Sequence, residues 1–186
     1  QNNSSLQDIS AITSLTTIGE FLIVAKNDTL TELGSWENLT SIGSFLSIEQ
    51  NQAIETIPSF LSLEMINGSL FIKNNQSLSR ISGFRNLNRI LSNVAIQSNP
   101  SLTAIDGMAL LNSVGGQFYL ETNAMLTEIT GLASLEQVDG FFAIRFNDSL
   151  VECGAIALLL GWPTGPPNDL VGGDISVKFN GPGCSL

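Results

Sequence analysis

The segment from Asn99 to Leu120, NPSLTAIDGMALLNSVGGQFYL, is one copy of a unit that recurs along most of the chain. The pattern returns every 24 residues, and an asparagine marks each copy. The marker residues are Asn3, Asn27, Asn51, Asn75, Asn99, Asn123 and Asn147. Internal periods of this length are typical of solenoids and other repeat arrays, so the unit as a whole predicts the fold.

Seven further positions of the unit are apolar in all six complete copies. Counted from the marker asparagine, they are positions 3, 6, 9, 12, 15, 19 and 21. The last two, Phe118 and Leu120 in the quoted copy, show the alternation of a short strand with one buried face. The spacing of the others indicates short extended pieces and bends that wrap around a core. One unit alone cannot bury seven apolar groups, so neighbouring units must stack, with equivalent residues in rows about 4.8 Å apart.

The marker asparagines are expected to form a ladder inside the turn that follows each strand. An inward amide has both a donor and an acceptor, so it can bond the backbone of its own coil and of the next. The predicted ladder consists of the seven markers and Asn180. Glycosylation is the other interpretation, because Asn27, Asn75 and Asn147 fit the acceptor pattern, as do Asn38 and Asn67 outside the ladder. The row persists at Asn99, where Pro100 forbids glycosylation, which favours the structural role.

The C-terminal part of the chain predicts a cap on the solenoid. The segment after Cys153 indicates a short helix ending at Gly161, followed by a turn-rich loop over 162–167. The repeat then resumes with a uniform offset of nine residues and reaches Asn180, so the loop is a single insertion. Cys153 is expected to bond with Cys184 and to pin the last strand over the end of the rod.

The repeated unit resembles a known family. The pattern I-x-G-x-x-L-x-I-x-x-N-x-x-L-x-x-I-x-x-L-x-x-L, seen in 42–63 and 114–135, is similar to the receptor L-domain, a leucine-rich-repeat relative of receptor ectodomains. Similar repeats occur in fungal wall proteins and bacterial surface proteins. The resemblance covers residues 3 to about 180 and implies a right-handed parallel β-solenoid, extracellular or cell-surface placement, and binding rather than catalysis. The chain lacks the cysteine-rich module that separates paired L-domains in receptors.

Together, the repeat and the resemblance predict an all-β, right-handed parallel β-solenoid. We expect one domain over 1–186, with about seven 24-residue coils. The coils cover 3–146, and a C-terminal capping coil covers 147–186, with its short helix and disulfide.

The composition argues against several classes of function. The chain has 17 acidic and 7 basic residues, so clustered cations for nucleic-acid binding are not expected. No apolar run approaches the roughly 18 residues of a membrane span. The absence of histidine removes His-based acid–base chemistry, and no phosphate-loop, zinc or calcium motif is present. The stacking of Glu128 and Glu152 predicts a solvated or cation-bridged pair rather than a glycosidase site. The prediction is a non-enzymatic protein with no cofactor, no nucleic-acid partner and no transmembrane segment.

Aromatic residues at outward strand positions provide one candidate binding face. Exposed aromatic side chains on a flat sheet are unusual for a monomer and supply much of the energy at binding interfaces. The candidate residues are Phe21, Phe45, Phe71, Tyr119, Phe141 and Phe146. They predict a protein or carbohydrate ligand; the alternative is that other parts of the molecule cover them.

A second candidate surface is a basic band within an acidic protein. No acidic residue occurs between Ser69 and Ile105, and the segment carries Lys73, Arg80, Arg85 and Arg89. Straight stacking predicts no acidic partner for these arginines. The band is either a site for an anionic ligand or a second copy of the chain, or a solvated surface.

The first coil has a full apolar set but no visible polar cap. Either this coil is tilted or short, or another domain or another copy covers it. An alternative function is therefore a self-assembling structural surface or filament protein that stacks through this end. Ice binding is a minor alternative, because Glu55 and Glu64 interrupt the threonine-bearing rows at positions 4 and 13.

Overall fold

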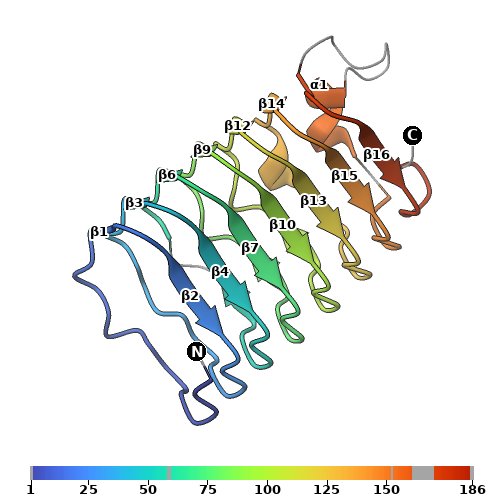
Figure 1. Ribbon diagram of the computed structural model, residues 1–186. Coiled ribbons are helices and arrows are strands. Elements are labelled where there is room, and N and C mark those ends of the chain that lie inside the picture. Colours follow the sequence, from blue (N-terminus) through green and yellow to red (C-terminus); the bar gives the residue numbers. More distant parts are fainter. Residues whose placement is uncertain (1, 58–59, 152, 161–169, 185–186) are drawn as a thin grey trace.

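The computed structural model describes residues 2–57, 60–151, 153–160 and 170–184. The chain winds as a parallel β-solenoid, with one long strand of each coil facing the viewer in Figure 1. The N-terminal coil and the segment with α1 and β16 form opposite ends of the rod. Gly161, the predicted loop over 162–167 and Glu152 lie outside the described residues.

All strands have two or four residues, because the chain must bend repeatedly to close each coil. The elements are β1 (Thr17–Ile18), β2 (Leu22–Ala25), β3 (Ser41–Ile42), β4 (Leu46–Glu49), β5 (Thr56–Ile57), β6 (Met65–Ile66), β7 (Leu70–Lys73), β8 (Arg80–Ile81), β9 (Arg89–Ile90), β10 (Val94–Gln97), β11 (Ala104–Ile105), β12 (Ser113–Val114), β13 (Phe118–Glu121), η1 (Thr130–Leu132), β14 (Gln137–Val138), β15 (Phe142–Arg145), η2 (Gly154–Ile156), α1 (Ala157–Leu160) and β16 (Ile175–Lys178).

Three parallel sheets run along the rod. The seven-stranded sheet has the order β16-β15-β13-β10-β7-β4-β2, the six-stranded sheet β1-β3-β6-β9-β12-β14, and the three-stranded sheet β11-β8-β5. Equivalent residues pair directly, as in Leu46 with Leu70 and Leu70 with Val94. Phe142 pairs with Ile175, which accommodates the nine extra residues of the predicted insertion. The predicted stacking of equivalent residues in rows is confirmed.

The apolar rows form the core. Every predicted core side chain in the second to sixth copies is at most 3% exposed. Aromatic members stack on one another, with ring centroids of Phe60 and Phe84 5.1 Å apart. The first coil differs, since Ile12 is 41% and Leu15 38% exposed. A neighbouring coil covers only one side of these residues, so the first coil contributes much less buried surface than the sequence pattern suggests.

The asparagine ladder lies inside the turn after each long strand. The Asn51 backbone N–H donates to Asn75 Oδ1 at 3.1 Å, and Asn51 Nδ2 donates to the Val24 carbonyl at 2.9 Å. The same pattern repeats along the row and ends at Asn180, whose Oδ1 accepts from the Asn147 N–H at 3.2 Å. Each amide from Asn51 to Asn147 therefore satisfies backbone groups that the turn would otherwise leave buried without partners. The predicted first member, Asn3, is exposed, and only its backbone N–H takes part, by donating to Asn27 Oδ1 at 3.2 Å.

The ladder also bears on glycosylation. The side chains of Asn27, Asn75 and Asn147 are buried and hydrogen-bonded, so a glycan on any of them is incompatible with the folded structure. Of the predicted acceptor residues, only Asn38 and Asn67 are exposed.

The described part of the C-terminal segment contains η2, the single turn α1 and strand β16. A disulfide joins Cys153 to Cys184, with the two Cα atoms 5.2 Å apart. Cys184 is buried against the core, and β16 pairs with β15 to cover the last complete coil.

Removing this disulfide is expected to lower the free energy of unfolding by about 2–4 kcal/mol, because it closes a long loop in the unfolded chain. Urea unfolding of a Cys153→Ser/Cys184→Ser variant measures the change. The wild-type protein under reducing conditions serves as the control and should show the same loss. An unchanged unfolding midpoint in both would contradict the proposed role of the bond in pinning β16.

Candidate functional site

The outer face of the seven-stranded sheet carries a row in which large and small side chains alternate as far as Ala143. In register, the row reads Ile23, Ser47, Phe71, Ala95, Tyr119, Ala143 and Ser176. Ser47, Ala95 and Ala143 are buried, whereas the larger neighbours on either side are half-buried. The large side chains therefore cover the small ones and leave a continuous, largely apolar surface.

The predicted aromatic residues form two clusters on this side. The Phe21 and Phe45 rings stack at 5.2 Å, and Phe45 lies 6.2 Å from Phe71. Tyr119 and Phe141 form the second cluster, with centroids 5.8 Å apart. Phe21 is 49% exposed, and the other four are half-buried. Five of the six predicted aromatic residues thus gather in clusters on or beside the strands of the seven-stranded sheet.

Phe146 does not belong to either cluster. It lies in the turn after β15, and its ring stacks on Phe179 with centroids 5.0 Å apart. Phe179 was missed by the sequence analysis, although it follows Phe146 by one repeat plus the nine-residue insertion.

A row of charged side chains borders the aromatic clusters. Lys73 Nζ lies 4.8 Å from the centroid of the Phe71 ring, and the Arg145 guanidinium lies 5.7 Å from that of Phe141. Arg145 Nε donates to Glu121 at 2.7 Å, and Gln97 Nε2 donates to the other carboxylate oxygen at 2.8 Å. An apolar centre with a polar rim is the usual anatomy of a protein–protein interface.

The predicted lack of an acidic partner for Arg80 is wrong. Arg80 Nη2 lies 2.5 Å from Asp106 Oδ2, and this carboxylate raises the pKa of Arg80 above its ordinary value. Asp106 belongs to the next coil but lies two positions further along its unit, so the contact is diagonal. Comparison of straight rows alone does not find it.

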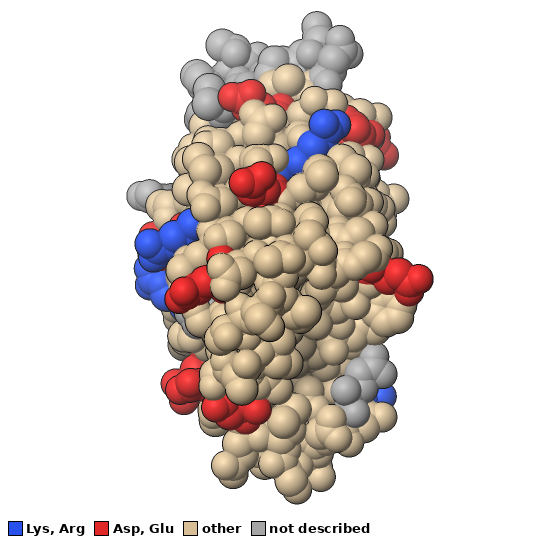
Figure 2. All heavy atoms as spheres, turned by 90° about the vertical axis from the view of Figure 1, so that its left-hand side faces the viewer, with Lys and Arg blue, Asp and Glu red and all other residues tan. Residues whose placement is uncertain are grey.

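The four residues of the basic band are distributed over the coil rather than gathered. Lys73 is on β7, Arg80 on β8 and Arg89 on β9, and these strands belong to three different sheets; Arg85 lies between β8 and β9. Figure 2 shows acidic and basic side chains interspersed on one face of the molecule, most of which is uncharged. This arrangement does not favour a single anion-binding surface.

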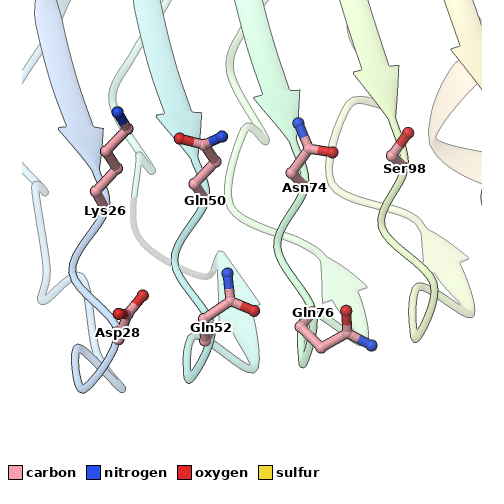
Figure 3. Close-up of a pocket in the computed structure, with 7 residues that line it drawn as sticks. All are labelled: Lys26, Asp28, Gln50, Gln52, Asn74, Gln76 and Ser98. Atoms are coloured by element: carbon pink, nitrogen blue, oxygen red, sulfur yellow. The ribbon is translucent and has the colours of Figure 1, made fainter.

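A polar trough lies at the turns that follow the long strands. It has a volume of about 490 Å³ and runs across four successive coils (Figure 3). It is lined by Lys26, Asp28, Gln50, Gln52, Asn74, Gln76 and Ser98. None of these residues was a candidate from the sequence, because they share neither charge nor hydrophobicity.

The fold defines a parallel β-solenoid with one broad, aromatic-bearing face. The receptor L domain family model matches residues 42–151, more than half of the chain, and the chain belongs to this family. Receptor L domains are binding domains rather than catalytic ones. Neither the search of curated proteins nor the search of solved structures found a match. Among the described residues, no helix has the length and apolar character needed to span a membrane.

Proposed function

We propose that this protein is a non-enzymatic extracellular or cell-surface module that binds a protein ligand through the outer face of its seven-stranded sheet. The observation that carries the proposal is the aromatic cluster of Phe21, Phe45 and Phe71. Phe21 and Phe45 directly precede β2 and β4, and Phe71 lies on the adjacent β7 with Lys73 Nζ over its ring. Such clusters provide large contact areas at low cost in conformational entropy. Family membership and the disulfide support extracellular placement.

The proposed module comprises the whole chain, 1–186, wound as a right-handed solenoid of about seven coils. The seven strands of the largest sheet support the number of coils, because each coil contributes one strand to this sheet. In this arrangement, 147–186 forms the capping coil and the binding face extends along the length of the rod.

The aromatic face is expected to contain the main binding residues. A Phe45→Ala/Phe71→Ala variant should bind the ligand about 10- to 100-fold more weakly, because each truncation removes a central aromatic contact. The experiment screens a display library of extracellular proteins against the immobilised wild-type chain, and each hit is titrated against both proteins by surface plasmon resonance.

Phe146→Gly is the matched control, since it removes an aromatic ring that lies outside the face. Circular dichroism checks that the double variant remains folded. Hits that bind wild type and the double variant with equal affinity would contradict the proposed face, as would a screen without hits.

Self-assembly through the first coil is the second candidate function. It is favoured by the exposure of Ile12 and Leu15 and by the position of β2 at the edge of the seven-stranded sheet. Sedimentation velocity over a range of concentrations tests it. Concentration-dependent association that is lost in Ile12→Ser/Leu15→Ser supports assembly, whereas a constant monomer excludes it.

A further inference from the structure

We propose that the polar trough is a second binding site, which takes a neutral polysaccharide chain lying along the solenoid axis. The site is separate from the aromatic sheet face and does not depend on the protein ligand proposed above. Two rows of side chains define it, one directly after the long strands and one two residues further along the chain.

The first row consists of Lys26, Gln50, Asn74 and Ser98, which follow β2, β4, β7 and β10. The second consists of Asp28, Gln52 and Gln76, and Figure 3 shows the two rows running side by side from coil to coil. The buried asparagines of the ladder lie between the rows in sequence and fix each turn by hydrogen bonds. The polar side chains are therefore presented at the regular spacing of the strands, about 4.8 Å.

The residues of the first row share a backbone conformation that usually favours glycine. Lys26, Gln50, Asn74 and Ser98 have φ between 55° and 57°, and the row continues with Thr122, Phe146 and Phe179 at 57° to 59°. Glycine adopts this left-handed conformation without the steric penalty that other residues incur. No residue of the row is glycine. Strain that persists in a repeated surface position is a reason to look for function there.

The trough amides are available to a ligand. Within the described part of the chain, the side chains of Gln50, Gln52, Asn74 and Gln76 make no hydrogen bond to another protein group. Some other exposed amides are bonded to the backbone of a neighbouring coil; Asn38 Nδ2 donates to the Thr13 carbonyl at 2.9 Å, and Asn86 Nδ2 to the Leu61 carbonyl at 2.8 Å. A row of free amides at constant spacing is an array of paired donors and acceptors.

The chemistry of the trough matches a neutral glycan. A sugar hydroxyl, like an amide, both donates and accepts, and an extended chain of β-1,4-linked hexoses advances by about one coil spacing per sugar. Lys26 and Asp28 are the only charged groups of the lining and have opposite signs, so a polyanion is disfavoured. Further along the first row, the Phe146 and Phe179 rings are 48% and 59% exposed and offer a flat apolar platform for a pyranose face.

The test measures binding of soluble hexasaccharides by isothermal titration calorimetry. The probes are hexamers of β-1,4-linked glucose, β-1,3-linked glucose and β-1,4-linked N-acetylglucosamine. The test variant is Gln50→Gly/Asn74→Gly, because glycine removes the amides and suits the positive φ, so the fold is preserved. We expect at least one hexamer to bind the wild-type chain and the variant to bind it at least about tenfold more weakly. Phe146→Gly should weaken binding similarly.

Two controls separate this site from the rest of the surface. Asn88→Ala removes an exposed amide on another side of the coil and should leave the affinity unchanged, as should Phe45→Ala/Phe71→Ala on the sheet face. Absence of binding to all three hexamers would overturn the proposal. Loss of binding in the sheet-face variant with full binding in Gln50→Gly/Asn74→Gly would also overturn it, by locating the glycan on the aromatic face. An extended peptide that binds the trough when the hexamers do not would replace the glycan as ligand.

Discussion

Replacement of Asn99 by alanine is expected to lower the free energy of unfolding by about 3–6 kcal/mol, a large part of the stability of an ordinary domain. Asn99 Oδ1 accepts from the Asn75 backbone N–H at 3.1 Å, and its Nδ2 donates to the Ile72 carbonyl at 3.0 Å. Alanine leaves these two buried backbone groups without these partners. The Asn75 side-chain amide also loses its bond to Asn99 Oδ1 at 3.2 Å, but keeps the one that its Nδ2 donates to the Ile48 carbonyl at 2.9 Å. Each buried group that loses its partner costs about 1–3 kcal/mol.

Urea unfolding followed by circular dichroism measures this effect. Asn88→Ala is the control, because Asn88 is exposed; its free energy of unfolding should stay within about 0.5 kcal/mol of wild type. Equal stabilities for Asn99→Ala and Asn88→Ala would mean that the ladder contributes nothing to the fold.

Truncation of Leu87 to alanine is expected to cost about 3–5 kcal/mol, because the side chain is fully buried and its removal leaves a cavity in the rod. Leu15 occupies the same row of the repeat in the first coil but is 38% exposed. Leu15→Ala should therefore cost less than about 1 kcal/mol, since solvent already reaches this side chain.

The two leucine variants form a matched pair for thermal and urea unfolding. They differ only in the coil that carries the substitution, so the comparison isolates the effect of having a covering coil on both sides. Similar losses for Leu15→Ala and Leu87→Ala would show that the first coil is as well packed as the fourth, contrary to the structure.

The core and the ladder were predictable because the same environment recurs at every coil. Leu87 occupies the same position of the repeat as Leu63 in the preceding coil and Leu111 in the following one. One correct alignment of the repeat therefore predicts the burial of all three. The asparagine row is likewise identified as structural, because it persists at Asn99, where Pro100 forbids glycosylation. A single copy of the pattern predicts little, but its recurrence in every coil predicts the fold of the whole chain.

Features that break the repetition could not be predicted in this way. Arg80 contacts Asp106, which lies in the next coil but at a different position of the repeat. A comparison of equivalent positions does not find this contact. The nine-residue insertion hides the relation between Phe146 and Phe179. The trough was missed because the residues of its first row, such as Gln50 and Ser98, share only a backbone conformation. Without glycine, the sequence gives no sign of a positive φ.

The whole structure depends on equivalent residues that stack in rows, with the asparagine amides buried between coils. The most direct test is the hydrogen-exchange rate of the side-chain amide protons, measured by NMR on the intact chain. The Nδ2 protons of Asn51, Asn75, Asn99 and Asn123 should exchange orders of magnitude more slowly than those of the exposed Asn88. Exchange of all five at the same rapid rate would contradict the stacked structure and, with it, both proposed binding surfaces.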